Sequence, residues 1–134
     1  MKRLAFLISG GVLVAFAGTA YAFAQLVSPP LWSEIDNSAA CYVRNTGSVP
    51  VAVQVQIFSN FGPNAPLNPT FQNCNNAPLP AGRTCVVLVN DLPDSQFVAC
   101  SATGEKLGKI RGTLEIREST PSTPLRVTVA QDLR

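Results

Sequence analysis

Alternation of apolar and polar side chains is the feature that most constrains how this chain folds. Between residues 51 and 57, valine or isoleucine at each odd position alternates with alanine or glutamine at each even one. A period of two is typical of a strand with one face on a core and the other in water. Shorter apolar or alternating runs lie at 41–44, 85–89, 97–102, 109–117 and 125–129. No stretch after residue 22 has convincing helical spacing, so the sequence predicts an all-β fold.

Turn-forming residues separate these runs at 45–48 and 90–94, and we expect 104–106 to form a tight hairpin connection. Pro29 and Pro30 interrupt an earlier apolar segment, which predicts a split edge strand because proline cannot donate to a ladder. Gly112 occupies an inward position in its run, which indicates a bulge or close backbone packing. About seven strands in a mature chain of this length suggest an antiparallel β-sandwich.

The first 22 residues have the three parts of a secretory signal. Lys2 and Arg3 form a basic head, residues 4–17 are apolar, and Ala-Tyr-Ala at 20–22 predicts cleavage between Ala22 and Phe23. The next small-x-small site is Ala-Phe-Ala at 22–24. The apolar run is shorter than the roughly 20 residues of a membrane span. We therefore expect a signal peptide at 1–22, a single domain at 23–134 and no membrane span in the mature chain, which is exported to the periplasm or secreted.

All four cysteines, Cys41, Cys74, Cys85 and Cys100, lie in the exported part. An even number in a small exported domain indicates two disulfides. Of the three pairings, we favour Cys41 with Cys100 and Cys74 with Cys85, because the first two lie in apolar strand patterns and Cys74 lies in a loop close in sequence to Cys85. A zinc site is not expected, because structural zinc sites use cysteines two to four residues apart.

The charge balance gives no sign of a polyanionic partner. The chain has 10 lysines and arginines against 8 acidic residues, and Lys2 and Arg3 leave with the signal, so the mature domain is neutral. The sequence shows no basic cluster. We therefore expect neither nucleic acid nor an anionic lipid surface as a partner.

The residues available for catalysis are few. The chain has no histidine, which removes the usual general base and metal ligand. A serine or cysteine nucleophile needs an adjacent base, and the only mature lysines, Lys106 and Lys109, flank a turn. Asp91 and Asp94 are ordinary turn residues. We predict that the protein is not an enzyme and has no catalytic, cofactor-binding or metal-binding residues.

The most unusual segment is 59–82, which is rich in proline and asparagine and contains Cys74. Connections this long are uncommon in compact domains and are usually functional or disordered. Phe61, Leu67 and Phe71 are the candidate contact residues of this loop. We favour the interpretation that they cap an open end of the sandwich, which would bury Phe71; recognition of a partner by an exposed loop is the alternative.

Several strand and turn positions form a familiar pattern: Cys41, Val43, Asn45, Gly47, the long alternating strand, 79–82, Cys100 and 111–114. Together they resemble small exported bacterial proteins of immunoglobulin-like sandwich type whose function is unassigned. The resemblance covers about residues 39–117 and implies a disulfide between facing sheets, from Cys41 to Cys100. Antibody-type domains would add a tryptophan after the first cysteine and a tyrosine two residues before the second. Here Trp32 precedes the first cysteine and Val98 stands at the tyrosine position, so the resemblance implies a fold and no activity.

We therefore expect a non-enzymatic structural or interaction domain that binds an unknown protein or surface partner through the 59–82 loop. The alternative is an inhibitor of an extracellular hydrolase, in which the disulfide-braced loop enters the partner's active site already ordered. An inhibitor loop should be exposed, whereas a capping loop should bury Phe61 and Phe71. A subunit of a surface fibre assembled by strand donation ranks lowest, because Pro29 and Pro30 interrupt the only N-terminal arm.

Overall fold

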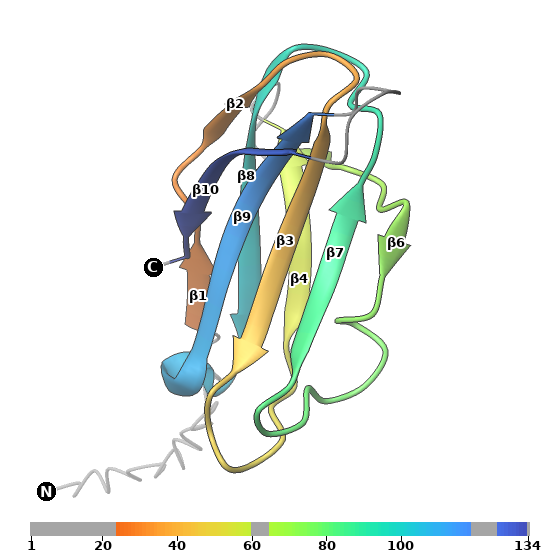
Figure 1. The fold of residues 1–134 in the computed structure, drawn as a ribbon. Helices are drawn as coiled ribbons and strands as arrows, with labels where there is room; N and C mark the ends of the chain where they lie inside the picture. Colours follow the sequence, from red (N-terminus) through yellow and green to blue (C-terminus); the bar gives the residue numbers. More distant parts are fainter. Residues whose placement is uncertain (1–23, 60–64, 119–125, 134) are drawn as a thin grey trace, which may run out of the picture.

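The computed structural model describes residues 24–59, 65–118 and 126–133 (Figure 1). These residues form strands in two sheets, and every strand pair is antiparallel. In this part of the chain the single helix is a short 3₁₀ turn, η1 (Leu107–Lys109). The predicted signal peptide, its predicted cleavage site at Ala22 and Phe23, and Phe61 lie outside the described residues.

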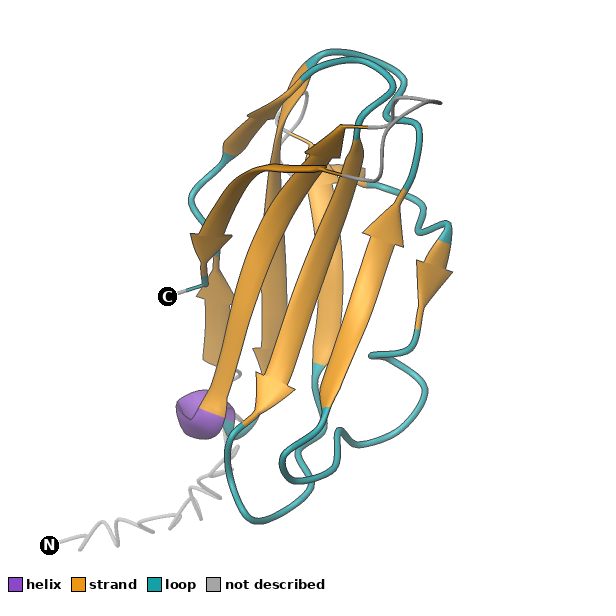
Figure 2. Ribbon diagram, in the orientation of Figure 1, coloured by secondary structure: helices purple, strands orange, loops and turns teal. Residues whose placement is uncertain are grey.

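Each sheet has five strands (Figures 1 and 2). Sheet A has the order β1 (Ala24–Val27), β8 (Gln96–Gly104), β4 (Gln54–Ser59) and β5 (Ala65–Pro66), and β2 (Leu31–Ser33) also pairs with β8. Sheet B has the order β10 (Arg126–Asp132), β9 (Ile110–Glu118), β3 (Ser38–Asn45), β7 (Thr84–Val89) and β6 (Phe71–Gln72). The two sheets lie face to face, in the arrangement of a β-sandwich.

The core lies between the sheets, and the period of two places residues in it. Val51, Val53, Val55 and Ile57 are all buried, as the alternation predicts, and the glutamines between them are exposed. The facing sheet supplies its own inward row, which includes Cys41, Val43, Val87, Leu114 and Ile116. The predicted all-β fold is therefore confirmed.

The edge strand of sheet A is split, as the two prolines predict. β1 and β2 both pair with β8, and Pro29 and Pro30 lie between them. Ser28 maintains the hydrogen bonding at this gap: its N–H donates to the carbonyl of Cys100 (2.9 Å), and its Oγ accepts from the N–H of Cys100 (2.9 Å). The buried backbone of β8 therefore keeps its partners where the strand beside it is interrupted.

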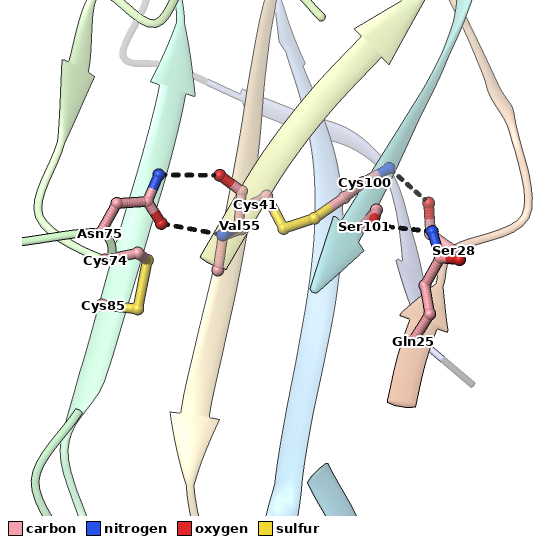
Figure 3. The surroundings of a disulfide bond; sticks show 9 residues. All are labelled: Gln25, Ser28, Cys41, Val55, Cys74, Asn75, Cys85, Cys100 and Ser101. Carbon is pink, nitrogen blue, oxygen red and sulfur yellow. Dashed lines mark hydrogen bonds between the residues drawn. A yellow bond between two sulfur atoms is a disulfide. The ribbon is translucent and has the colours of Figure 1, made fainter. Parts of the chain in front are cut away.

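Both favoured disulfides are present (Figure 3). Cys41 of β3 joins Cys100 of β8, so this bridge links sheet B to sheet A, with a Cα–Cα distance of 6.0 Å. Cys74 joins Cys85 at the start of β7 with a Cα–Cα distance of 5.0 Å, and anchors the proline- and asparagine-rich loop to sheet B.

Two expectations were wrong, one about the connection at 104–106 and one about the number of strands. Residues 104–106 do not close a hairpin, because β8 lies in sheet A and β9 in sheet B, and the chain crosses between the sheets through η1. The described residues also contain ten strands instead of about seven. The additional strands come from the split edge strand and from β5 and β6, which are two-residue strands within the 59–82 loop.

Candidate functional site

The loop that the sequence singles out covers the open side of the sandwich, beginning with the edge of β4. The side chain of Asn75 faces Val55 and behaves as a paired backbone segment (Figure 3). Its Oδ1 accepts from the N–H of Val55 (2.8 Å), and its Nδ2 donates to the carbonyl of Val55 (3.2 Å). Beyond it, the N–H of Leu67 donates to the carbonyl of Ile57 (2.8 Å). The edge of β4 is thus satisfied without a full strand.

The same loop also covers the edge of β7 in the other sheet. Asn73 pairs with Val86 through its N–H (3.1 Å to the carbonyl) and through its Oδ1, which accepts from the N–H of Val86 (2.7 Å). The N–H of Thr70 donates to the carbonyl of Leu88 (2.8 Å). Since exposed strand edges invite pairing with other chains, this loop protects both sheets on one side.

The capping interpretation is correct for Leu67 and wrong for Phe71. Leu67 is partly buried and packs against the core, whereas Phe71 is 51% exposed. Phe71 pairs with Leu88, which alternates with the inward residues Val87 and Val89, and the period of two therefore turns this position outward. Phe61, the third candidate, lies outside the described residues.

An exposed aromatic cluster lies elsewhere, where β2 meets the start of β8. Trp32 and Phe97 are cross-strand partners, 48% and 42% exposed, with ring centroids 5.0 Å apart in an edge-to-face arrangement. Ile35, which is also exposed, lies two residues after the end of β2. We call these three residues the aromatic patch. Large exposed apolar groups gathered in one place mark interaction sites more often than isolated ones do.

Hydrogen bonds hold the aromatic patch in place. The indole Nε1 of Trp32 donates to Oε1 of Glu34 (2.8 Å). The other oxygen of Glu34 accepts from Oγ of Ser95 (3.1 Å), and that Oγ accepts from the N–H of Ile35 (3.1 Å). The ring of Trp32 is therefore oriented by its own carboxylate partner, which lowers the entropy that a binding event would cost.

Sequence reasoning missed the aromatic patch, although a signal for it exists. Cys100 points inward, so two-residue alternation along β8 puts Val98 inward and Phe97 outward. An outward phenylalanine on a strand is an exposed aromatic, and this much could be read from the sequence. The pairing with Trp32, 65 positions earlier, depends on the register of β2 against β8.

The fold also gathers the cations at one end of the sandwich. Five exposed residues form this basic end: Arg44, Arg83, Lys106, Lys109 and Arg111. Arg44 and Arg111 are direct partners across β3 and β9. Two backbone hydrogen bonds place Arg83 and Lys109 beside the end of β3. The N–H of Asn45 donates to the carbonyl of Arg83 (3.0 Å), and that of Thr46 donates to the carbonyl of Lys109 (2.8 Å). The sequence has no basic cluster, and it is the fold that brings these separate cations to one end; the absence of a nucleic-acid partner stays a prediction.

The opposite end of the sandwich carries carboxylates. Four exposed residues form this acidic end: Glu34, Asp36, Asp91 and Asp94. Their two loops are joined by backbone hydrogen bonds, from the N–H of Asp36 to the carbonyl of Leu92 (2.9 Å) and from the N–H of Leu92 to the carbonyl of Asn37 (2.9 Å). Because Glu34 also binds Trp32, the acidic end and the aromatic patch form one continuous surface.

In the described ranges, no three histidine, cysteine or acidic side chains gather as metal ligands would. Among the described residues, Arg117 has a shifted pKa: its hydrogen bond to Glu115 raises the pKa of the guanidinium, partial burial opposes this, and coulombic attraction to Tyr42 adds to it. Arg117 also donates to the hydroxyl of Tyr42 and lies over its ring. These three side chains tie β3 to β9 on the outer face of sheet B. The lack of enzymatic activity stays a prediction.

No helix among the described residues has the length and apolar character needed to cross a membrane.

Comparison with known proteins gives no match to a family model, to a curated protein or to a solved structure.

Proposed function

We propose that the mature chain is a non-enzymatic exported domain, periplasmic or secreted, that binds a partner through the aromatic patch. The observation that carries this proposal is the half-exposed pair of Trp32 and Phe97, fixed by Glu34 and Ser95. Tryptophan and other aromatic anchors dominate binding energies at interfaces, most of all when they are already ordered. The patch thus replaces the 59–82 loop as the leading binding face.

Export is supported by the two disulfides, since oxidising compartments form and keep such bonds. If residues 1–22 are a cleaved signal, mass spectrometry of the exported protein should find its N-terminus at Phe23, or at Gln25 if the second site is used. An exported product that retains Met1 would contradict this prediction.

The immunoglobulin-like assignment is part of the same proposal. The bridge from Cys41 to Cys100 joins facing sheets, as the disulfide of immunoglobulin domains does. In those domains the strand after the second cysteine pairs with the strand that carries that cysteine. Here β9 lies beside β3 instead, and β1 and β2 occupy the place next to β8. We therefore propose an immunoglobulin-like sandwich in which the strand after the second cysteine has changed sheets.

Site-specific photo-crosslinking tests the binding face. A photoreactive residue placed at position 32 should give a crosslinked adduct in cells that export the protein. The matched control is the same residue at position 56, because Gln56 is also exposed but lies in the middle strand β4, away from the patch. Absence of any adduct from position 32, or equal adducts from both positions, would overturn the proposal.

Inhibition of an extracellular hydrolase is kept as a second candidate because Phe71 is exposed. Its loop is anchored by the bond between Cys74 and Cys85 and by the hydrogen bonds of Asn73 and Asn75. A braced loop that presents an aromatic side chain has the form that an inhibitor needs. Strand donation gains no such support, because β1 and β2 of the same chain already line the edge of β8.

A further inference from the structure

We infer that the partner of the aromatic patch is a second copy of this chain, docked head to tail, with the basic end of one copy on the acidic end and aromatic patch of the next. The inference rests on the proposed function, because it uses the same patch and names its occupant. It joins three features of the described residues: opposite charges at opposite ends, exposed aromatic rings, and exposed apolar side chains at both ends.

Charged residues are distributed unevenly between the two ends of the sandwich. β3 runs from the acidic end to the basic end, from the top to the bottom of Figure 1. Residues 24–43 and 84–104, which supply the four carboxylates of the acidic end and the strands leading from it, contain no lysine or arginine. The end of β9 brings Arg117 opposite Ser38, where its guanidinium is paired with Glu115, and β10 begins with Arg126 opposite Glu118. At the basic end, Glu105 precedes Lys106, and Asp132 pairs with Thr113, two positions beyond Arg111. Four exposed carboxylates thus lie at one end and five exposed cations at the other, and such ends are complementary in charge.

The chemistry of the acidic end suits a basic partner in particular. Guanidinium groups bind carboxylates through paired hydrogen bonds and also stack on aromatic faces, most strongly on tryptophan. Glu34 and the ring of Trp32 offer both kinds of contact within one hydrogen-bonded cluster. Three of the five residues of the basic end are arginines, Arg44, Arg83 and Arg111. A second copy therefore brings the side chains that this surface can bind.

The basic end gains from the same contact. Arg44 and Arg111 are directly opposite each other on adjacent strands, and like charges in that position destabilise a sheet. Carboxylates from another copy would offset this repulsion. Val49 is exposed in the turn after β3, where Asn45 Nδ2 donates to its carbonyl (2.7 Å). In the docked pair it supplies an apolar contact for Ile35 or Trp32 of the other copy. A polyanion would use only the basic end and leave the aromatic patch uncovered.

Because the two surfaces differ and lie at opposite ends, the contact is heterologous. A docked pair keeps one free basic end and one free acidic end, so association continues into open chains of molecules instead of stopping at a dimer. This predicts a distribution of sizes that grows with protein concentration. It also predicts weakening by salt, since the contact depends on exposed charges.

Sedimentation velocity of the mature, disulfide-bonded protein tests the inference. We expect oligomers at about 20 mM salt that dissociate at about 500 mM, where screening acts within a few ångströms. The double substitution Arg44→Glu with Arg83→Glu alters the basic end and should give a monomer. The triple substitution Asp36→Asn, Asp91→Asn and Asp94→Asn alters the acidic end and should do the same; asparagine tolerates the positive φ of Asp36 and Asp91. Gln56→Glu, on an exposed position between the ends, is the control and should leave the oligomers unchanged.

Mixing the two end variants gives the sharpest outcome. Each keeps one intact end, so an equimolar mixture should form one-to-one dimers and nothing larger. A protein that stays monomeric at low salt, or oligomers that survive both sets of substitutions, would overturn the inference. So would a monomer that binds a sulfated polysaccharide through its basic end. A crosslink from position 32 to a different protein, with no self-association, would leave the proposed function standing and reject the second copy as its partner.

Discussion

The amide of Asn75 takes the place of a neighbouring strand at the edge of β4, because it both accepts from and donates to Val55. Asn75→Ala leaves the backbone N–H and carbonyl of the buried Val55 without these partners. An unsatisfied buried polar group costs about 1–3 kcal/mol of stability. We predict that destabilisation, measured by denaturant unfolding. Asn76→Ala, at the adjacent exposed position, should change the free energy of unfolding by less than about 0.5 kcal/mol. Equal effects of the two substitutions would show that the amide does not pair with the strand.

A glycine allows the chain to cross from one sheet to the other. A Cβ atom at Gly104 would lie 2.6 Å from the backbone carbonyl oxygen of Ala52, which cannot easily move. We therefore predict that Gly104→Ala lowers the free energy of unfolding by about 1–3 kcal/mol, as overpacked sites do. Gly108→Ala is the matched control in the same connection, since nothing lies within 4 Å of its Cβ position. A thermal melt in which Gly104→Ala is neutral would contradict the close approach.

At the scale of elements, the two disulfides should differ in their contribution to stability. The bridge between Cys41 and Cys100 spans 59 positions, and that between Cys74 and Cys85 spans 11. In the chain-entropy model they contribute about 4 and about 3 kcal/mol. Replacing the first pair with alanines should therefore destabilise the protein more than replacing the second. Denaturant unfolding of the two double variants measures this, and the reverse order would contradict it.

The sequence predicted what alternation alone can determine. It identified the buried row from Val51 to Ile57, the split edge strand and the close packing at Gly112, where a Cβ would lie 3.0 Å from the carbonyl oxygen of Tyr42. Alternation tells which side chains face the core, but not which sheet the next strand joins. For that reason residues 104–106 looked like a hairpin although they connect two sheets. Phe71 was misplaced because its short strand, β6, carries no readable pattern.

At the scale of the whole molecule, the candidate site depends on distances that the sequence does not contain. The cations of the basic end are spread over residues 44–111. They lie together only because β3 pairs antiparallel with β7 and β9, so that the end of β3 lies beside the beginnings of the other two strands. The same packing puts the loops at 33–37 and 90–95 side by side and sets Trp32 on Phe97. A nearly balanced composition, with 10 lysines and arginines against 8 acidic residues, therefore conceals a molecule with two different ends, one basic and one both acidic and aromatic.

Fluorescence of Trp32 tests most directly whether the aromatic patch is a binding face, because this is the only tryptophan in the chain. In the dilute mature protein its half-exposed ring should emit as a solvated indole and be readily quenched by acrylamide. As protein concentration rises at low salt, we predict a shift of the emission to shorter wavelength and a loss of quenching, both reversed by high salt. Emission and quenching that stay constant while the protein associates would contradict the account, because the patch would then remain uncovered.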